Sequence, residues 1–507
     1  AIVSMAVGFI FHIFAFCAAA YLPGIFITTK GGEIMESVTL LDILIIFAYL
    51  IGMLWIGFYF TKKIKTSGDF FIAGRTLGPV VLMATVCASI IGGSALIGRG
   101  GYAYNGGMVA IAIALPYMVG MYIFSFCTGH IADIGRKYNI TSIPELMEYR
   151  FGKTAKLLAG AMIAYSMAAT VGAQISATAT VFGVVGGNFG INYVWGAIIA
   201  SAIFIIYTAS SGLFGVVYTD LVQFFILILF VYILLPILSI REVGGMAALI
   251  DQTPPEKFQL NLSPDIITLI FTNLVMTIAG AEFWQRAFAA KDRKSALRGQ
   301  FGGTVVYSLT IAVTLFLGLS AALLFPNLIE QYGTADYAIP VMVATILPPG
   351  LTGLTFAGLL SVMMSSADTC ILVATQAGVN DIWRTLHPDM TDRQELRLSR
   401  IITVLISLFA LVVALFYTSA YDALMFAWTF YAAAMGLPCL AALYWKKANN
   451  PGILAGMIVG LVTSIVWKLL GEPYSIGSTI AGVALCGVAL VGVTLATYKK
   501  YPSRQTD

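Results

Sequence analysis

Long runs of apolar residues, separated by short polar segments, follow one another along almost the whole chain. Most runs are about 20 residues long, which is the length that an α-helix needs to cross the hydrocarbon core of a bilayer. A β-barrel would instead show short segments of alternating polarity. The pattern therefore predicts an all-α protein that crosses the membrane many times. The predicted spans are 2–26, 40–60, 78–101, 106–127, 157–181, 192–211, 213–240, 266–288, 301–325, 351–382, 401–418, 424–445, 452–470 and 475–498.

The first run, 2–26, has two interpretations. It is long enough for a spanning helix, which we favour because the apolar region of a signal peptide is usually shorter. The alternative is a signal peptide cleaved near Ala18-Ala19-Ala20.

Basic residues are unevenly distributed between the loops. Most of the 28 Lys and Arg residues lie in alternate loops, at 62–75, 136–156, 291–298, 384–400, 446–447 and 499–504. The loops between them contain Lys30, Arg241 and Lys257. Because positively charged loops stay in the cytoplasm, the first set and the C-terminus are predicted to be cytoplasmic, in a protein of the cell membrane. The outer loop 326–350 contains DYAIPVMVATILP (336–348), predicted to be a helix over the mouth of the protein.

Composition supports this class of protein. Of the 507 residues, 59% are apolar and 10% are charged, whereas soluble domains have about 25% charged residues. The six cysteines stand singly in apolar runs, and the three histidines form no metal-binding pattern. We therefore expect no enzyme, no cofactor and no nucleic-acid partner; the expected partners are lipid, a coupling cation and a solute.

Two spans contain residues that interrupt a helix. Gly92-Gly93 lies in the middle of span 78–101, and Gly280 lies in span 266–288, shortly before Glu282. Glycine weakens a helix, and non-helical backbone within a membrane persists only where it is buried in protein or lines a cavity. The alternative is that these small residues only permit tight helix packing.

Interrupted spans in corresponding positions of two halves are typical of transporters built from inverted repeats. We therefore predict two five-helix repeats, 78–240 and 266–445, with opposite orientations in the membrane. The segments 1–60 and 452–498 are predicted to add peripheral helices at the two ends.

A polar cluster interrupts the apolar run 351–382. At helical spacing Val362, Ser365, Ser366 and Thr369 share one face. Hydroxyl and carbonyl oxygens suit a hard cation such as Na⁺. The alternative, hydrogen bonding of the hydroxyls to their own helix, does not account for Asp368, because carboxylates at membrane depth are costly and usually functional.

A second carboxylate, Asp220, lies one helical turn from Gln223 in the span 213–240. Two carboxylates on separate helices can share a cation, or one of them can hold a proton. The alternative is that Asp220 is a solvated residue near the cytoplasmic end of its helix.

Ordered motifs from Leu40 to Lys500 resemble the sodium/solute symporter family. They are FFIAGRTLGP (70–79), ATVCASIIGGS (84–94), TSIPELMEYRFG (141–152), SGLFGVVYTDLVQ (211–223), MMSSADTCILVATQAGVNDIW (363–383) and GEPYSIG (471–477). The resemblance implies a LeuT-like fold, a 5+5 inverted repeat with additional N- and C-terminal helices and 13 or 14 spans in total. It also implies Na⁺-coupled import of a small organic solute by alternating access.

The resemblance also implies a Na⁺ site between the first broken helix and the serine pair. Its ligands would be the carbonyls of Ala88, Ile91 and Val362 and the hydroxyls of Ser365 and Ser366. Some members bind a second Na⁺ near positions that correspond to Asp220, Asp368 and Thr369. An aspartate at position 368 departs from the family's hydroxyl pattern, so a second cation and a proton both remain alternatives there.

Among members of the family, the motifs SSAD and GEPY are closest to those of choline carriers. Those carriers surround the quaternary ammonium with aromatic faces, but Ile90 and Gly280 replace two of their tryptophans, so choline is not the expected substrate. Arg99 either attracts an anion or extends to the outer surface. The candidate substrate residues are Ser89, Ser94, Gln174, Glu282, Trp284, Gln285, Trp428 and Thr429.

Three other functions are considered. Proton-coupled symport of an organic acid or amine would use Asp220 and Asp368. A channel is disfavoured because broken helices flank a closed site at the membrane midplane. A sensor or membrane enzyme would need a cytoplasmic domain or a catalytic cluster, and the sequence contains neither.

Overall fold

The computed structural model describes residues 38–61, 73–260 and 262–502, and within these ranges the chain is almost entirely helical. Eleven of the described helices are long and apolar enough to cross a membrane. A bent pair, Pro79–Ile90 and Ser94–Gly106, forms a further crossing, and the shorter apolar helix Tyr193–Thr208 corresponds to the predicted span 192–211. The predicted span 2–26 lies outside the described residues.

The described chain begins with α2 (Leu40–Thr61) and ends with α21 (Asn450–Leu469) and α22 (Ser478–Thr497). The first half between them contains α4 (Pro79–Ile90), α5 (Arg99–Gly106), α6 (Val109–Lys137), α7 (Ile143–Phe151), α8 (Lys153–Val185), α9 (Tyr193–Ile226), α10 (Leu235–Val243) and α11 (Met246–Gln252). The second half contains α12 (Pro264–Ala279), α13 (Ala281–Ala289), α14 (Arg293–Leu324), α15 (Leu328–Tyr332), α16 (Ala338–Ile346), α17 (Leu351–Gln376), α18 (Arg384–Leu386), α19 (Asp392–Phe416) and α20 (Ala420–Tyr444).

Both halves have the same order of helices. Each begins with a broken helix, α4–α5 in the first and α12–α13 in the second, and continues with one long helix. A short helix then precedes the most buried helix of each half: α7 precedes α8, and α16 precedes α17. This order agrees with the predicted inverted repeat, whose boundaries stay a prediction.

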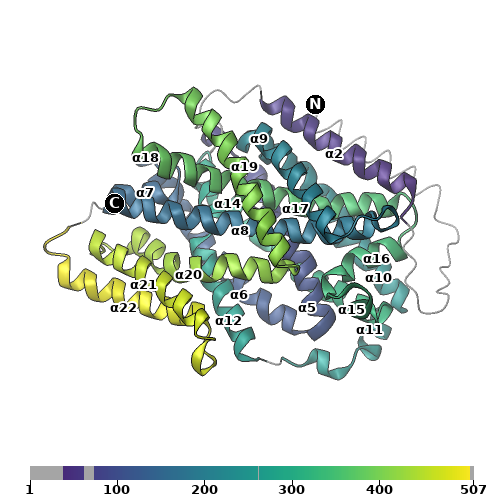
Figure 1. The fold of residues 1–507 in the computed structure, drawn as a ribbon. Helices are drawn as coiled ribbons and strands as arrows, with labels where there is room; N and C mark the ends of the chain where they lie inside the picture. Colours follow the sequence, from purple (N-terminus) through teal and green to yellow (C-terminus); the bar gives the residue numbers. More distant parts are fainter. Residues whose placement is uncertain (1–37, 62–72, 261, 503–507) are drawn as a thin grey trace.

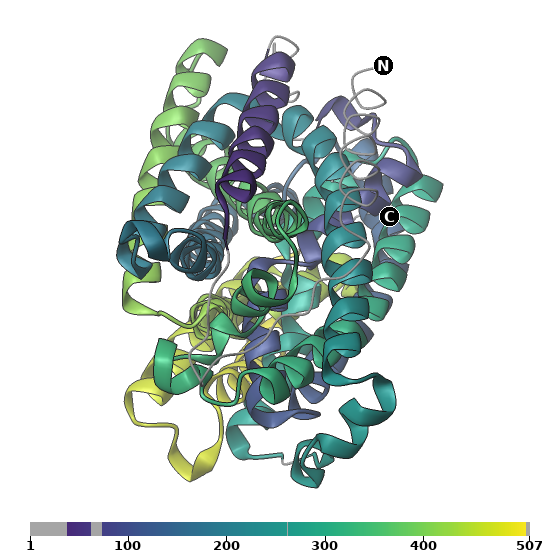
Figure 2. The same ribbon diagram turned by 90° about the vertical axis from the view of Figure 1, so that its right-hand side faces the viewer.

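The helices α8 and α17 form the centre of the bundle. In the apolar part of α17 every residue is buried and in that of α8 94% are, compared with 33% in α21 and α22. Figure 1 shows α2 and the pair α21–α22 at opposite edges of the bundle, and Figure 2 shows α2 along the outside in the turned view. The polar residues of α17 therefore lie far from lipid.

The first break is located at the predicted glycines. The helix α4 ends at Ile90, the backbone of Ile91 turns (φ −85°, ψ 80°), and the chain continues at an angle of 54°. A Cβ atom at Gly93 would lie 2.6 Å from Met363 Cγ and 2.8 Å from Ala177 Cβ. Any larger residue would therefore push the broken helix away from α17 and α8.

The second break is located at Gly280, between α12 and α13. Its backbone (φ −58°, ψ 97°) leaves the helical conformation for one residue, after which the helix restarts. A Cβ atom there would lie 2.7 Å from Phe283 Cδ2. Both predicted interruptions are thus real, and small residues are required at them.

The element α9 turns back on itself. Tyr207 Oη contacts Thr219 Oγ1, although twelve residues of straight helix would separate them by about 18 Å. The segments Tyr193–Thr208 and Gly215–Val243 therefore run past each other, as the two predicted spans require. This return brings Thr208 and Asp220 to the same central region.

The predicted mouth helix is attached to the bundle through Asp336. This residue lies in η6 (Ala335–Tyr337), just before α16, and is 5% exposed. Its Oδ2 accepts a hydrogen bond from the Ala420 N–H at 2.8 Å, and its Oδ1 would lie 2.9 Å from a Cβ atom at Gly101 of α5. Burial raises the pKa of Asp336 to about 6, the Ala420 N–H opposes this shift, and nearby Asp422 adds to it.

We expect the folded protein to lose stability as the pH rises, because the buried Asp336 carboxyl becomes charged. Burial favours the neutral carboxyl, so its contribution to stability is complete below pH 4 and falls as the pH rises towards about 6. The loss is on the order of 2–3 kcal/mol. The variant Asp336→Asn carries a neutral group at every pH, so it should melt at a higher temperature than the wild type above pH 6. If the melting temperatures of the two proteins change with pH in the same way between pH 4 and pH 8, Asp336 does not have this role.

Candidate functional site

The first break releases the carbonyl of Ala88 from its helix. In an α-helix this carbonyl would accept the N–H of residue 92. The Gly92 N–H instead donates to Ile90 O at 3.1 Å. A carbonyl released inside a membrane needs another donor or a cation, and Ala88 faces the polar part of α17.

The hydroxyls of Ser365 and Ser366 both donate to this carbonyl. The distances from Ala88 O are 3.0 Å to Ser365 Oγ and 3.2 Å to Ser366 Oγ. Ser365 Oγ is also 3.1 Å from Val362 O, within its own helix. Three hydrogen-bonding distances therefore link four of the five predicted Na⁺ ligands in a chain, from Val362 O through Ser365 Oγ and Ala88 O to Ser366 Oγ.

The fifth predicted ligand, Ile91, lies at the break itself. Its side chain is buried, and its N–H still bonds to Cys87 O at 3.0 Å. The ψ angle of 80° turns its carbonyl away from the direction of the helix axis, since helical residues have ψ near −42°. The Ile91 carbonyl is therefore no longer aligned with α4, at the same break where the Ala88 carbonyl loses its helical hydrogen bond.

Gln174 stabilises the break from α8. Its Oε1 accepts the Gly93 N–H at 2.7 Å, so that N–H does not bond to Ser89 O as it would in a helix. Ser89 O is then 3.5 Å from Ser366 Oγ. Gln174 was predicted as a substrate residue, and this hydrogen bond joins it to the backbone of the broken helix.

The second predicted site contains an arginine that the sequence analysis did not select. Asp220 Oδ2 accepts from Thr85 Oγ1 at 2.5 Å and lies 3.7 Å from Nη2 of Arg286. Arg286 also donates to Thr369 Oγ1 at 2.6 Å and to Thr85 Oγ1 at 3.2 Å. Asp220 is completely buried, so the solvated interpretation was wrong. A guanidinium group therefore lies between two residues predicted to bind a cation or a proton.

Asp368 points to a different neighbour. Its Oδ1 accepts from Thr208 Oγ1 at 2.6 Å, whereas its Oδ2 is buried without a hydrogen-bond partner in the described part of the chain. Thr369, the next residue, donates to Ser365 O at 2.9 Å and so follows the alternative interpretation of bonding within the helix. Asp220 and Asp368 thus hydrogen-bond to different threonines, Thr85 and Thr208.

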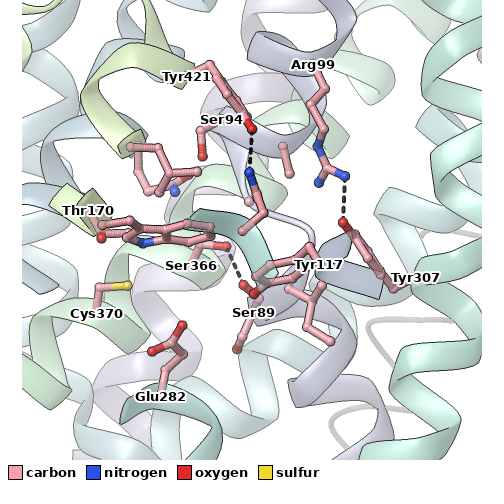
Figure 3. A pocket seen from close by; sticks show the side chains of 17 residues that line it. Ser89, Ser94, Arg99, Tyr117, Thr170, Glu282, Tyr307, Ser366, Cys370 and Tyr421 are labelled. Atoms are coloured by element: carbon pink, nitrogen blue, oxygen red, sulfur yellow. Dashed lines mark hydrogen bonds between the residues drawn. The ribbon is translucent and has the colours of Figure 1, made fainter. Parts of the chain in front are cut away.

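A pocket lies beside the Na⁺ ligands, between the two broken helices. Its volume is about 40 Å³, whereas pockets that hold a bound ligand usually measure about 300–1,000 Å³, so it is narrow in this conformation. Figure 3 shows Arg99 near one end and Glu282 near the other. The residues that line it are Ser89, Ile90, Gly92, Ser94, Ala95, Arg99, Tyr117, Thr170, Gln174, Asn273, Glu282, Tyr307, Ser366, Cys370, Tyr421, Leu424 and Trp428.

Five of the predicted substrate residues belong to this lining: Ser89, Ser94, Gln174, Glu282 and Trp428. The other three have contacts elsewhere. Trp284 Nε1 donates to Ile278 O at 2.9 Å, Gln285 Nε2 donates to Gln376 Oε1 at 3.0 Å, and Thr429 Oγ1 donates to Met425 O at 2.8 Å.

Several lining residues were not selected from the sequence. Tyr117 stacks on Trp428 with ring centroids 5.6 Å apart, and Tyr307 meets Tyr117 edge-on at 5.7 Å. Aromatic residues in apolar spans give no distinct signal of a binding site, because most of them only pack in the core.

Arg286, which does not line the pocket, did give such a signal, since an arginine at membrane depth is as costly as the aspartates that were selected.

The chain was compared with known proteins and structures. A model described as the sodium:solute symporter family matches residues 70–460. The osmoregulated proline transporter OpuE of Bacillus subtilis is 27% identical over 454 residues, which cover 85% of this chain and 89% of that protein. The sodium/pantothenate symporter of Haemophilus influenzae is 26% identical, over 80% of this chain and 86% of that protein. The sodium/myo-inositol cotransporter 2 of Rattus norvegicus is 24% identical, over 85% and 70%.

Among solved structures, a Na⁺-coupled sialic acid symporter in a substrate-bound outward-open state has the same fold. The TM-score is 0.77 at 20% identity, and the match covers 93% of this chain and 100% of that one. The predicted LeuT-like fold is therefore confirmed.

We expect Arg286 and Asp220 to depend on each other. The variant Arg286→Met leaves a buried carboxylate without its cation and should destabilise the protein by about 3–5 kcal/mol. Adding Asp220→Asn to that variant removes the unpaired charge and should restore much of the loss. Thermal unfolding in detergent measures both effects. Asp381→Asn, which removes a buried carboxylate bonded to Ser142, is the matched control; equal rescue by both asparagines would disprove the pairing.

Proposed function

Because this chain belongs to the sodium:solute symporter family, its import of a small organic solute is coupled to Na⁺, and we propose that the coupling Na⁺ binds between α4 and α17. Its ligands are the carbonyls of Ala88, Ile91 and Val362 and the hydroxyls of Ser365 and Ser366. The observation that carries this proposal is the meeting of both hydroxyls with Ala88 O, at 3.0 and 3.2 Å, across two helices.

The chemistry of these groups suits Na⁺. All five ligands are neutral oxygens, and hard cations prefer oxygen donors. A serine hydroxyl rotates freely about its C–O bond, so it can turn from donating to Ala88 O to presenting a lone pair to the ion. This rotation would let both hydroxyl oxygens face the ion.

Ser366 provides a direct link between Na⁺ and solute. Its hydroxyl belongs to the proposed Na⁺ site, and the same residue lines the pocket. A Na⁺ ion that holds Ser366 against Ala88 would also hold one wall of the pocket in place. Since coupling between two binding sites is reciprocal, Na⁺ and solute should strengthen each other's binding by the same factor.

Alternating access would use the two breaks. The segments α5 and α13 follow the breaks and lie on opposite sides of the pocket, so each can move without carrying the rest of its helix. We propose that the charged loops and the C-terminus are cytoplasmic, as the positive-inside rule predicts, and that 78–240 and 266–445 are the repeats that move against each other.

Proton coupling is the second candidate, and a specific observation favours it. Asp368 Oδ2 is buried without a partner in the described residues, and a neutral carboxyl is less costly there than a carboxylate. Uptake into proteoliposomes whose interior is free of Na⁺ separates the candidates. Accumulation driven by an inward pH gradient alone supports protons, whereas accumulation only with an inward Na⁺ gradient supports Na⁺.

The Na⁺ site has a test that needs no solute. Na⁺ binding to the folded protein should raise its melting temperature with concentration, relative to K⁺ at equal ionic strength. The double variant Ser365→Ala, Ser366→Ala removes two of five ligands and should abolish this shift. Ser361→Ala is the matched control, because Ser361 is buried on α17 but bonds to Tyr49. Full Na⁺ stabilisation of the double variant would rule the site out.

A further inference from the structure

We propose that the pocket selects a small zwitterionic solute, with its anionic group at Arg99 and its cationic amino group at Glu282. This inference rests on the proposed function and adds the substrate class, which the relatives do not decide. Proline is a zwitterion, pantothenate is an anion and myo-inositol is neutral, yet carriers named for all three resemble this chain to a similar extent.

The anionic group of the solute would meet Arg99. This residue begins α5, the segment after the first break, and lines the pocket. Its Nη1 donates to Tyr307 Oη at 2.6 Å, and its guanidinium lies over the same ring, 5.3 Å from the centroid. No carboxylate pairs with Arg99 among the described residues. The guanidinium thus keeps donors for an anion while Tyr307 holds it in position.

The amino group of the solute would meet Glu282. This residue begins the segment after the second break, is 6% exposed and lines the same pocket. Its Oε2 is buried without a hydrogen-bond partner in the described part of the chain. Arg286, one turn further along α13, directs its hydrogen bonds to Thr85, Thr369 and the backbone carbonyl of Glu282. The carboxylate is therefore left without a hydrogen-bond donor from its cationic neighbour.

The two opposite charges are held apart rather than paired. Each follows a different break, and Figure 3 shows them at opposite ends of the pocket with the neutral groups between them. Tyr117 and Trp428, stacked at an interplanar angle of 10°, supply a flat apolar surface along the pocket. This arrangement fits a compact apolar body that carries a charge at each end.

The energetics favour a zwitterion over an ion of either sign. A buried charge without a partner is costly, and a zwitterion would give an opposite charge to the buried Glu282 and to the half-buried Arg99 at once. A cationic solute would satisfy Glu282 but meet the repulsion of Arg99, and an anionic solute would meet the reverse. Unpaired charges placed against the wrong ligand are a common means of specificity.

The test uses a matched series of ligands with the full-length protein in detergent and saturating Na⁺. Proline, alanine and γ-aminobutyrate are the zwitterions; their methyl esters lack the anion, and their N-acetyl derivatives lack the cation. Thermal shifts as a function of ligand concentration give the affinities. We expect at least one zwitterion to bind, and at least tenfold more tightly than its ester and its N-acetyl derivative.

Two variants should change this preference in opposite ways. Arg99→Met should reduce the advantage of the zwitterion over its ester at least tenfold, with little effect on its advantage over the N-acetyl derivative. Glu282→Gln should do the reverse. A merely structural role of either residue would weaken all three ligands alike. Arg99→Lys and Glu282→Asp, which keep the charges, should retain the preference. Arg241→Met and Glu242→Gln remove exposed charges of α10 as controls.

The outcomes separate this inference from the function on which it rests. If no zwitterion binds, or if Na⁺ gradients drive uptake of a neutral or singly charged solute more efficiently, the zwitterion proposal fails and Na⁺ coupling stands. If a zwitterion binds but its uptake into proteoliposomes ignores Na⁺, the coupling fails and the substrate class stands. Equal loss of all ligands in both charge-removing variants, with normal folding, would also overturn the proposal.

Discussion

The carbonyl of Ala88 is the group on which the arrangement of the site depends. A backbone carbonyl inside a membrane must be satisfied by protein or by an ion, because no bulk water reaches it. The break at Ile91 takes away its helical donor, and the two serine hydroxyls of α17 replace that donor. The break, the glycines that permit it and the serine pair are therefore parts of one device. A helix that was continuous at this point would leave no free carbonyl for the proposed Na⁺ site.

Both breaks place a charged side chain in the lining of the pocket. At each break the chain gains a short segment whose direction is independent of the preceding helix, and each such segment carries a charged side chain into the pocket, Arg99 on α5 and Glu282 on α13. The glycines at the breaks allow close contact with Met363 and Phe283. Close packing and binding are thus not alternatives at these positions: the tight contact holds the backbone in the shape that exposes the binding groups.

The sequence was most informative where a regular period continued without interruption. The 3.6-residue repeat placed Val362, Ser365 and Ser366 on one face of a straight helix, which is how α17 presents them. A break resets that period, so the faces of α13 could not be extrapolated from α12. Glu282 consequently lines the pocket, whereas Trp284 and Gln285, two and three residues later, bond elsewhere. The contact of Arg286 with Asp220 joins α13 to α9, and no local pattern predicts such a pair.

The charged side chains around the two sites suggest why one cation is needed for transport. With every group ionised, the carboxylates Asp220, Asp368 and Glu282 carry three negative charges, and the guanidinium groups of Arg99 and Arg286 carry two positive charges. The empty centre then has an excess of one negative charge, which is costly to enclose at low dielectric. One Na⁺ brings the sum to zero, as would one proton on Asp368, and a zwitterion leaves it at zero. With the proposed Na⁺ and zwitterion bound, a closed state would be neutral, whereas a closed state holding solute without its coupling cation would keep an unpaired buried charge. On this balance, solute would not cross without the coupling cation.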